Sequence, residues 1–234
     1  MEISSFETGL ICDEREIYEQ LLSLQNADVL ELGCGKADKT MAIAGKVARI
    51  LALEVDEIQH AENICREKPD NVRFGRGGAE VIPADDESFD IVLMFKSLHH
   101  VPIEQMDAAL EEIRRVLKKG GVAYISEPVF AGDFNEILRL FHDEQRVREA
   151  AFASVKRAVD TGRFALSSQT FFLSPMCFAD FTEFENKILK VTHTQHRLSD
   201  ALHEEVRKKF MDHMTPDGAA FHMPVRVDLL QKPS

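Results

Sequence analysis

The segment VLELGCGKADKT, residues 29–40, holds the residues whose types and spacing say most about chemistry. Gly33 and Gly35 permit a tight turn and a close approach of the backbone to a ligand. The helix expected after them would offer unpaired N–H groups to an anion. Open α/β sheets place their ligand sites at such turns from strand to helix. We therefore expect a binding site here.

Two acidic residues give this site its character. Glu31 stands two positions before Gly33, where it could receive a cationic amino group and would repel a pyrophosphate. Glu54 ends the next apolar run, about 20 residues after the first glycine, where an acid can accept both hydroxyls of a ribose. Each acid alone is equally well explained as a solvated carboxylate at a strand end. Together they favour a nucleoside ligand that bears an amino-acid tail.

Two other classes of nucleotide site fit the segment less well. The pattern G-x-x-x-x-G-K-[ST] is absent, which excludes a Walker loop. The third glycine of the dinucleotide fingerprint is also missing, and Glu31 opposes a pyrophosphate. A dinucleotide-dependent oxidoreductase is therefore the weaker interpretation.

The elements that must position these residues alternate along the chain. Helices are expected at 13–25, 38–48, 57–67 and 104–118, with Lys118 and Lys119 at the end of the last. Between and after them lie the apolar runs ADVLEL, RILALEV, NVRF, SFDIVLMF and VAYISEP. Strand and helix in alternation predict an α/β fold, a doubly wound and mostly parallel sheet with right-handed crossovers.

The pattern changes after Pro128. Residues 133–161 are expected to form two helices, KILKVTH (187–193) a strand, 199–213 a helix and FHMPVRVDLLQKP a final strand. We interpret residues 1–234 as a single domain, in which this half is a largely helical elaboration on the sheet.

Composition narrows the class of protein. The 234 residues carry a net charge of -12, which makes a nucleic-acid partner less expected. No apolar run reaches the roughly 18–20 residues of a membrane span, and the acidic N-terminus does not resemble a signal peptide. The chain is therefore expected to be cytoplasmic. The four cysteines and nine histidines, His193 and His196 included, show no metal-ligand spacing, so no metal is expected.

Four segments, in order and spacing, resemble the core of the class I methyltransferases over roughly residues 25–128. They are ELGCG, LEVD, GGAEVIPADDESFDIVLMFKSLHHV and EEIRRVLKKGGVAYISEP. The resemblance implies a Rossmann-like, seven-stranded sheet whose last strand, here MPVRVDLLQKP, is antiparallel. It also implies the cofactor S-adenosylmethionine and transfer of its methyl group to a small molecule.

The family's cofactor contacts carry over by position. Gly33 and Gly35 would pass the methionine portion, with Glu31 near its amino group. Glu54 would bind the ribose hydroxyls, and Val55 would pack on adenine.

Two positions depart from the family's pattern. Gly78 stands where an aspartate usually contacts the adenine amino group, which leaves that contact to the backbone around Ala79 and Glu80, to water, or to the Glu80 carboxylate. Phe95 and Lys96 would line the sulfonium side, where small or polar residues are commoner than lysine. Lys96 is interpreted either as a receptor for an acidic group of the substrate or as an outward-facing surface lysine.

His99 and His100 follow directly and are the candidate catalytic bases, because imidazole titrates near neutral pH. The alternative is a structural role, packing on the neighbouring loop. Methyl transfer often needs no protein base, since alignment and exclusion of water can dominate the rate.

The substrate side is expected at about residues 1–22 and 129–200. The second region is rich in phenylalanine, which would either form an aromatic pocket or pack helices on the sheet. These residues are Phe130, Phe134, Phe141, Phe152, Phe164, Phe171, Phe172, Phe178, Phe181 and Phe184.

Two alternatives to a small-molecule methyltransferase stay open. An RNA or protein methyltransferase would need an extended or basic groove, and the NPPY-type motif is absent after the fourth strand, where MFKSLHH stands. A non-catalytic, cofactor-binding protein could have kept the fold. The nucleophile of the acceptor (O, N, S or C) and the oligomeric state do not follow from the sequence.

Overall fold

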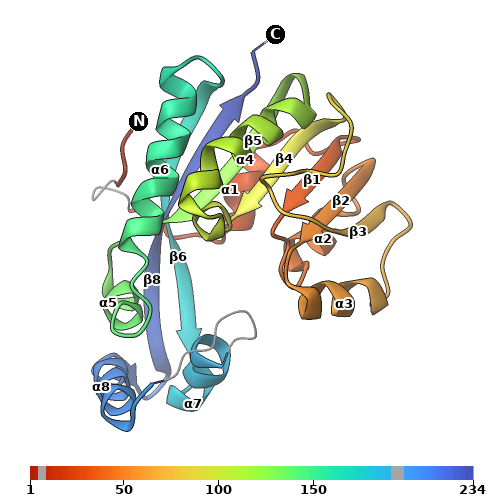
Figure 1. The fold of residues 1–234 in the computed structure, drawn as a ribbon. Helices are drawn as coiled ribbons and strands as arrows, with labels where there is room; N and C mark the ends of the chain where they lie inside the picture. The colour runs from red at the N-terminus through yellow and green to blue at the C-terminus, as the bar shows by residue number, and fades with distance from the viewer. Residues whose placement is uncertain (5–8, 191–197, 234) are drawn as a thin grey trace.

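The computed structural model describes residues 1–4, 9–190 and 198–233 (Figure 1). The α-helices are α1 (Glu14–Leu21), α2 (Asp38–Ile43), α3 (Glu57–Cys65), α4 (Met106–Val116), α5 (Asp133–Leu138), α6 (Gln145–Asp160), α7 (Phe181–Phe184) and α8 (Asp200–Met211). The strands are β1 (Asp28–Leu32), β2 (Arg49–Glu54), β3 (Val72–Arg76), β4 (Phe89–Phe95), β5 (Leu117–Pro128), β6 (Ala165–Phe178), β7 (Met214–Thr215) and β8 (Gly218–Gln231). Short 3-10 turns, η1 (Leu98–His100) and η2 (Ile103–Gln105), join β4 to α4.

One mixed sheet runs through the described chain in the order β3-β2-β1-β4-β5-β8-β6. Strands β1 to β5 are parallel, and β8 is antiparallel to both β5 and β6. The expected doubly wound sheet with an antiparallel last strand is thus confirmed. An eighth strand, the two-residue β7, pairs only with the start of β8.

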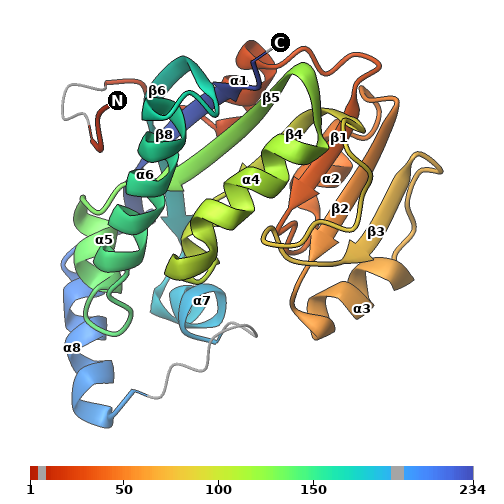
Figure 2. The same ribbon diagram turned by 45° about the horizontal axis from the view of Figure 1, so that its top comes forward.

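Helices cover both faces of the sheet because its strands are apolar on both sides. Val29 packs in the core that holds α1 and α2, whereas its neighbour Leu30 packs in the core under α4 and α6. Both side chains are fully buried, as expected when successive residues of a strand face opposite layers. Figure 2 shows α4 and α6 side by side on one of these faces.

The paired strands β6 and β8 run beyond the rest of the sheet and carry α5, α7 and α8 at their far end (Figure 1). There the buried rings of Phe134, Phe178, Phe181 and Phe184 contact one another and those of α8 and β8. Phe164 and Phe172 are buried in the two layers of the main core. These six phenylalanines therefore pack elements together, and the pocket-lining interpretation does not hold for them.

Several predicted boundaries were wrong. Helices α1 and α2 end at Leu21 and Ile43, before the expected ends at 25 and 48. A strand was expected at 187–193, but its first residues belong to a π-helical turn, Glu185–Leu189, that continues α7. Burial of Phe181, Phe184 and Leu189 against α8 stabilises helical backbone there, while residues 191–193 lie outside the described part. Helix α4 ends at Val116, so the expected helical end at 118–119 is the start of β5 instead.

Among the described residues, no helix combines the length and the apolar character that a membrane crossing requires. His193 and His196 lie outside the described residues.

Candidate active site

The glycine turn between β1 and α2 has the backbone shape that its sequence predicts. Gly33, Gly35 and Ala37 all adopt positive φ angles, of 70°, 51° and 58°. The N–H of Gly33 donates to the carbonyl of Leu53 at 2.9 Å, which ties the turn to the end of β2. A Cβ on Gly33 would lie 2.8 Å from Cβ of Ser97, so this position is closed to a side chain by conformation and by space.

Glu54 ends β2 with its carboxylate turned into that turn. Its Oε2 accepts from the N–H of Gly35 at 2.7 Å, and its Oε1 accepts from Val55 and Asp56 at 2.8 and 3.0 Å. The residue is 8% exposed. A carboxylate offers about four acceptor positions. Three are taken by backbone donors, so a diol would use the remaining one and compete with Gly35 for another.

Glu31, in β1, is buried, and its Oε2 accepts from the Thr40 hydroxyl at 2.5 Å. Burial raises the pKa of Glu31 to about 7, and the nearby carboxylates of Glu54 and Asp38 add to this, while Thr40 and Lys39 oppose it. A buried carboxyl with so high a pKa lacks a full counter-charge. An ammonium group would supply one.

Gly78 and Glu80 follow β3 and share one small volume. A Cβ on Gly78 would lie 2.4 Å from both carboxylate oxygens of Glu80, so the Glu80 carboxylate rests on the Cα of Gly78. No hydrogen bond or ion pair joins this carboxylate to another of the described residues. The absence of a side chain at Gly78 therefore leaves room for the carboxylate of Glu80. Of the other two predicted adenine contacts, Val55 is 60% exposed and Ala79 is buried.

Lys96, just after β4, has the left-handed backbone that lysine rarely adopts, with φ 53°. Its ammonium lies 2.5 Å from Oε2 of Glu14, at the start of α1, where Glu14 is 2% exposed. Lys39 Nζ lies 3.8 Å from the same oxygen, and the Tyr124 hydroxyl donates to Oε1 at 3.5 Å. The Lys96 side chain thus points toward the carboxylate of Glu14 rather than outward into solvent.

Phe95 packs against two tyrosines beside this ion pair. Its ring centroid lies 5.7 Å from that of Tyr18 and 5.4 Å from that of Tyr124. Lys39 Nζ stands 5.6 Å from the ring centroids of both Tyr18 and Phe95. Helix α1 therefore covers the carboxyl end of β4 with aromatic surface, and the buried Glu14 anchors it there.

His99 and His100 lie in η1 with different surroundings. His99 is buried, and its Nδ1 lies 2.5 Å from Oε2 of Glu127, whose Oε1 accepts from the N–H of Leu98 at 2.9 Å. Burial lowers the pKa of His99, but the charge and hydrogen bond of Glu127, with Glu144, outweigh it and raise the value. Of the two candidate bases, only His100 is exposed.

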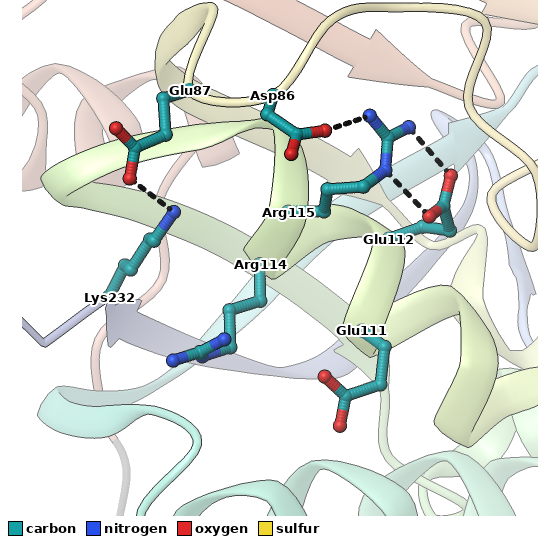
Figure 3. A pocket seen from close by; sticks show the side chains of 7 residues that line it. All are labelled: Asp86, Glu87, Glu111, Glu112, Arg114, Arg115 and Lys232. Carbon is teal, nitrogen blue, oxygen red and sulfur yellow. Dashed lines mark hydrogen bonds and ion pairs between the residues drawn. The ribbon is translucent and has the colours of Figure 1, made fainter.

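A shallow pocket of about 590 Å³ lies at the opposite ends of the strands from the glycine turn (Figure 3). It is bounded by the loop before β4 and by the end of α4, so it faces the amino ends of the strands. Arg115 pairs there with Glu112 and Asp86 at 2.7 and 2.8 Å, and Lys232 pairs with Glu87 at 3.3 Å. These charges satisfy one another, and we assign the pocket no function.

Known methyltransferases are similar to this chain in sequence over its first half and in fold over most of its length. Residues 29–121 match the family model described as a methyltransferase domain. Over these residues the chain is similar to methyltransferase domains.

Curated relatives share this domain in part. The chain is 29% identical over 133 residues to the uncharacterized methyltransferase YcgJ of Bacillus subtilis, covering 53% of this chain and 52% of YcgJ. It is 32% identical over 114 residues to the demethylmenaquinone methyltransferase of Chlorobaculum tepidum, covering 47% and 45%. The chain thus spans about half the length of the curated relatives it matches.

Solved structures extend the likeness in fold to nearly the whole chain. The crystal structure of YcgJ superposes with a TM-score of 0.68 at 18% identity, covering 94% of this chain and 97% of that one. The [4+2]-cyclase SpnF superposes with a TM-score of 0.59 at 20% identity, covering 94% and 79%. At such identities the methyltransferase-like fold is shared, and chemistry must be argued from the site.

Sequence reasoning did not single out several residues beside this candidate site, namely Glu14, Tyr18, Lys39 and Tyr124. The only local signal was the capping box of Asp13 and Glu16, which makes Glu14 the first residue of α1. Which side chain Glu14 would meet depends on how α1 docks, and spacing along the chain does not encode that.

Proposed function

We propose that this chain transfers the methyl group of S-adenosylmethionine to a small-molecule acceptor. One observation carries the proposal: Glu31 and Glu54, both buried, stand near the carboxyl ends of the neighbouring parallel strands β1 and β2, beside the turn of Gly33. Two buried carboxylates around a glycine turn suit a ligand with an ammonium group and a diol. They do not suit a polyphosphate.

The residues present fit the cofactor in its separate parts. Glu31 lacks a full counter-charge, which the amino group of the methionine portion would provide. Glu54 has one acceptor position free for the ribose and a second held only by Gly35. The exposed side chain of Val55 offers an apolar surface to the adenine. Each fit uses an acceptor position or a surface that the chain's own residues leave open.

Glu80 takes the place of the missing aspartate in this account. Its carboxylate occupies the space above Gly78 that an aspartate side chain at position 78 would fill. It has no partner among the described residues, so it is free to accept from the exocyclic amino group of adenine. The backbone at Ala79 lies beside it.

The cofactor, when bound, supplies an electrophilic methyl group on a sulfonium. The chain's own contribution is to align the acceptor and to exclude water. Helix α1 serves the second task, since Tyr18 and Phe95 pack together over the end of β4. Lys96 and Glu14 hold that helix in place, so these two residues act by positioning.

The acceptor is expected to enter beside the loop after β4, between Lys96 and His100. The phenylalanine cluster of the C-terminal half is closed by its own packing. The demethylmenaquinone methyltransferase among the relatives makes phenols and hydroquinones the first acceptors to test, although it shares only about half its length with this chain.

The test is an assay with methyl-labelled cofactor and separate panels of small acceptors, RNA and protein. Label that enters a small acceptor, and that is lost with Glu54→Ala, would support the proposal. Label that enters RNA or protein alone would overturn the small-molecule assignment. Tight binding of the cofactor without turnover on any panel would favour a non-catalytic role on the same fold.

A further inference from the structure

A cluster of histidines and carboxylates lies beside the residues assigned to the cofactor. His99 and His100 come from η1, and Glu144 immediately precedes α6, which packs against that turn. One ring nitrogen of each histidine and one oxygen of Glu144 lie within 4.8 Å of one another. Because Glu144 lies more than 40 residues after the two adjacent histidines, no spacing along the chain could have joined it to them.

The ring of His99 is held in one orientation. Its Nδ1 lies 2.5 Å from Glu127, a carboxylate that is itself buried and hydrogen-bonded by the N–H of Leu98. A carboxylate on one imidazole nitrogen fixes the tautomer and turns the other nitrogen toward a metal in many metalloproteins. Here that other nitrogen, Nε2, faces Oε1 of Glu144 at 3.6 Å.

This distance is too long for a hydrogen bond, which would bring nitrogen and oxygen to about 2.7–3.2 Å. When Nδ1 is the donor to Glu127, Nε2 presents a lone pair, and so does the oxygen opposite. In this neutral tautomer the two facing acceptors leave room for an electron-poor centre between them. Two ligands at a tetrahedral Zn²⁺, with bonds of about 2.0–2.2 Å, would lie roughly 3.4 Å apart, close to the separation observed.

The charges around the gap also favour a cation. Arg148 donates to the other oxygen of Glu144 at 2.5 Å, so it offsets one of the two carboxylates Glu127 and Glu144. Arg226 is matched by Asp228 at 2.8 Å. Neutral imidazoles therefore leave one net negative charge in a largely buried site. His142 Nε2 lies 3.0 Å from Oε1 of Glu144 and leaves that oxygen a second lone pair.

We propose that His99, His100 and Glu144 form a binding site for a divalent transition metal such as Zn²⁺. Glu127 orients His99, and Arg148 orients Glu144. Three protein ligands leave one position open, on the side where His100 is exposed. The site lies just beyond the carboxyl end of β4, so an oxygen of water or of an acceptor could fill the open position. The inference does not depend on cofactor binding.

The test uses the full chain without a histidine tag, stripped of metal with EDTA. Zn²⁺ affinity is measured by competition with a chromogenic chelator, and Co²⁺ is added separately to record the visible spectrum of its coordination sphere. We expect one metal per chain. His100→Ala and Glu144→Gln should each weaken Zn²⁺ binding by about tenfold or more, and Glu127→Gln by about 10–100-fold.

The matched control is His203→Ala. His203 pairs with Glu185 at 2.6 Å on the surface, so it is a histidine–carboxylate pair outside the proposed site. Its loss should leave Zn²⁺ affinity and the Co²⁺ spectrum unchanged. Substoichiometric binding, or equal affinity in the parent chain and His100→Ala, would overturn the proposal and leave a proton on His99 as the cation in the gap.

Discussion

The ammonium of Lys96 lies 2.5 Å from Oε2 of Glu14, and this ion pair joins the loop after β4 to the N-terminal helix. Glu14 is 2% exposed, whereas the Lys96 side chain is 29% exposed. The pair therefore satisfies a buried carboxylate and fixes α1 over the end of β4. The lysine that departs from the family's pattern thus has a structural partner.

Lys96→Met should leave the buried Glu14 with only Lys39 and Tyr124 nearby. We expect a loss of roughly 1–3 kcal/mol in the free energy of unfolding, measured with urea, because a buried charge loses its main partner. The double variant Glu14→Leu with Lys96→Met should recover part of that loss, since both charges are gone. If the single and double variants lose equal stability, the pair does not anchor α1.

Glu31 predicts how cofactor affinity changes with pH. Its pKa of about 7 means that the carboxyl is mostly protonated at pH 5.5 and mostly ionised at pH 7.5. Only the ionised form attracts an ammonium group, so affinity for S-adenosylmethionine should rise roughly tenfold or more over this range. Calorimetric titration at several pH values measures the slope. Glu31→Gln should flatten it, and an equally steep slope in that variant would exclude Glu31 as its source.

The raised pKa of Glu31 has the opposite effect on the stability of the fold, which decreases as pH rises. Because the pKa of Glu31 is raised in the folded chain above its ordinary 4.5, this group stabilises the fold most at low pH. Its contribution falls as pH rises from about 4.5 to 7 and is constant above that. Urea unfolding of the parent chain and of Glu31→Gln, compared across this window, should show a pH-dependent difference only there.

Glu80 and Gly78 offer a rescue experiment on adenine recognition. Glu80→Ala should weaken S-adenosylmethionine binding by about tenfold, through loss of an acceptor for the adenine amino group. Adding Gly78→Asp to Glu80→Ala should restore affinity, because the aspartate would enter the space that the Glu80 carboxylate vacates. A cofactor analogue with inosine in place of adenosine should bind the parent and Glu80→Ala alike. Unchanged affinity in Glu80→Ala would contradict the assignment.

The two glycines of the turn should differ in their tolerance of alanine. At Gly35 an added Cβ meets nothing within 4 Å, so the cost is that of a positive φ, about 1–2 kcal/mol. At Gly33 the same conformational cost is joined by a contact of 2.8 Å with Ser97, which adds roughly 1–3 kcal/mol. Thermal unfolding of Gly33→Ala and Gly35→Ala measures the difference. Equal losses would mean that Ser97 moves aside freely.

Local patterns predicted the parts of this molecule that are locally determined. The apolar runs became β1 to β5, and Gly33 with Gly35 formed the turn, because conformation at these positions is set within a few residues. Glu54 could be placed at a strand end for the same reason.

The remainder depends on contacts between distant segments. Glu14 meets Lys96 across 82 residues, and His99 faces Glu144 across 45, so no window of sequence contains either pair. The segment 187–190 has strand-like composition, yet packing of Leu189 with the phenylalanines of α7 keeps it helical. Tertiary packing overrides propensity in such short segments.

Calorimetric titration of S-adenosylmethionine into the parent chain and into Glu54→Ala tests the central assignment most directly. The site predicts binding of one molecule per chain, weakened by about tenfold or more in the variant, which corresponds to about 1.4 kcal/mol. NADH, titrated separately to test the dinucleotide-dependent oxidoreductase interpretation, should not bind. Absence of S-adenosylmethionine binding, equal affinity in Glu54→Ala, or preference for NADH would contradict the account.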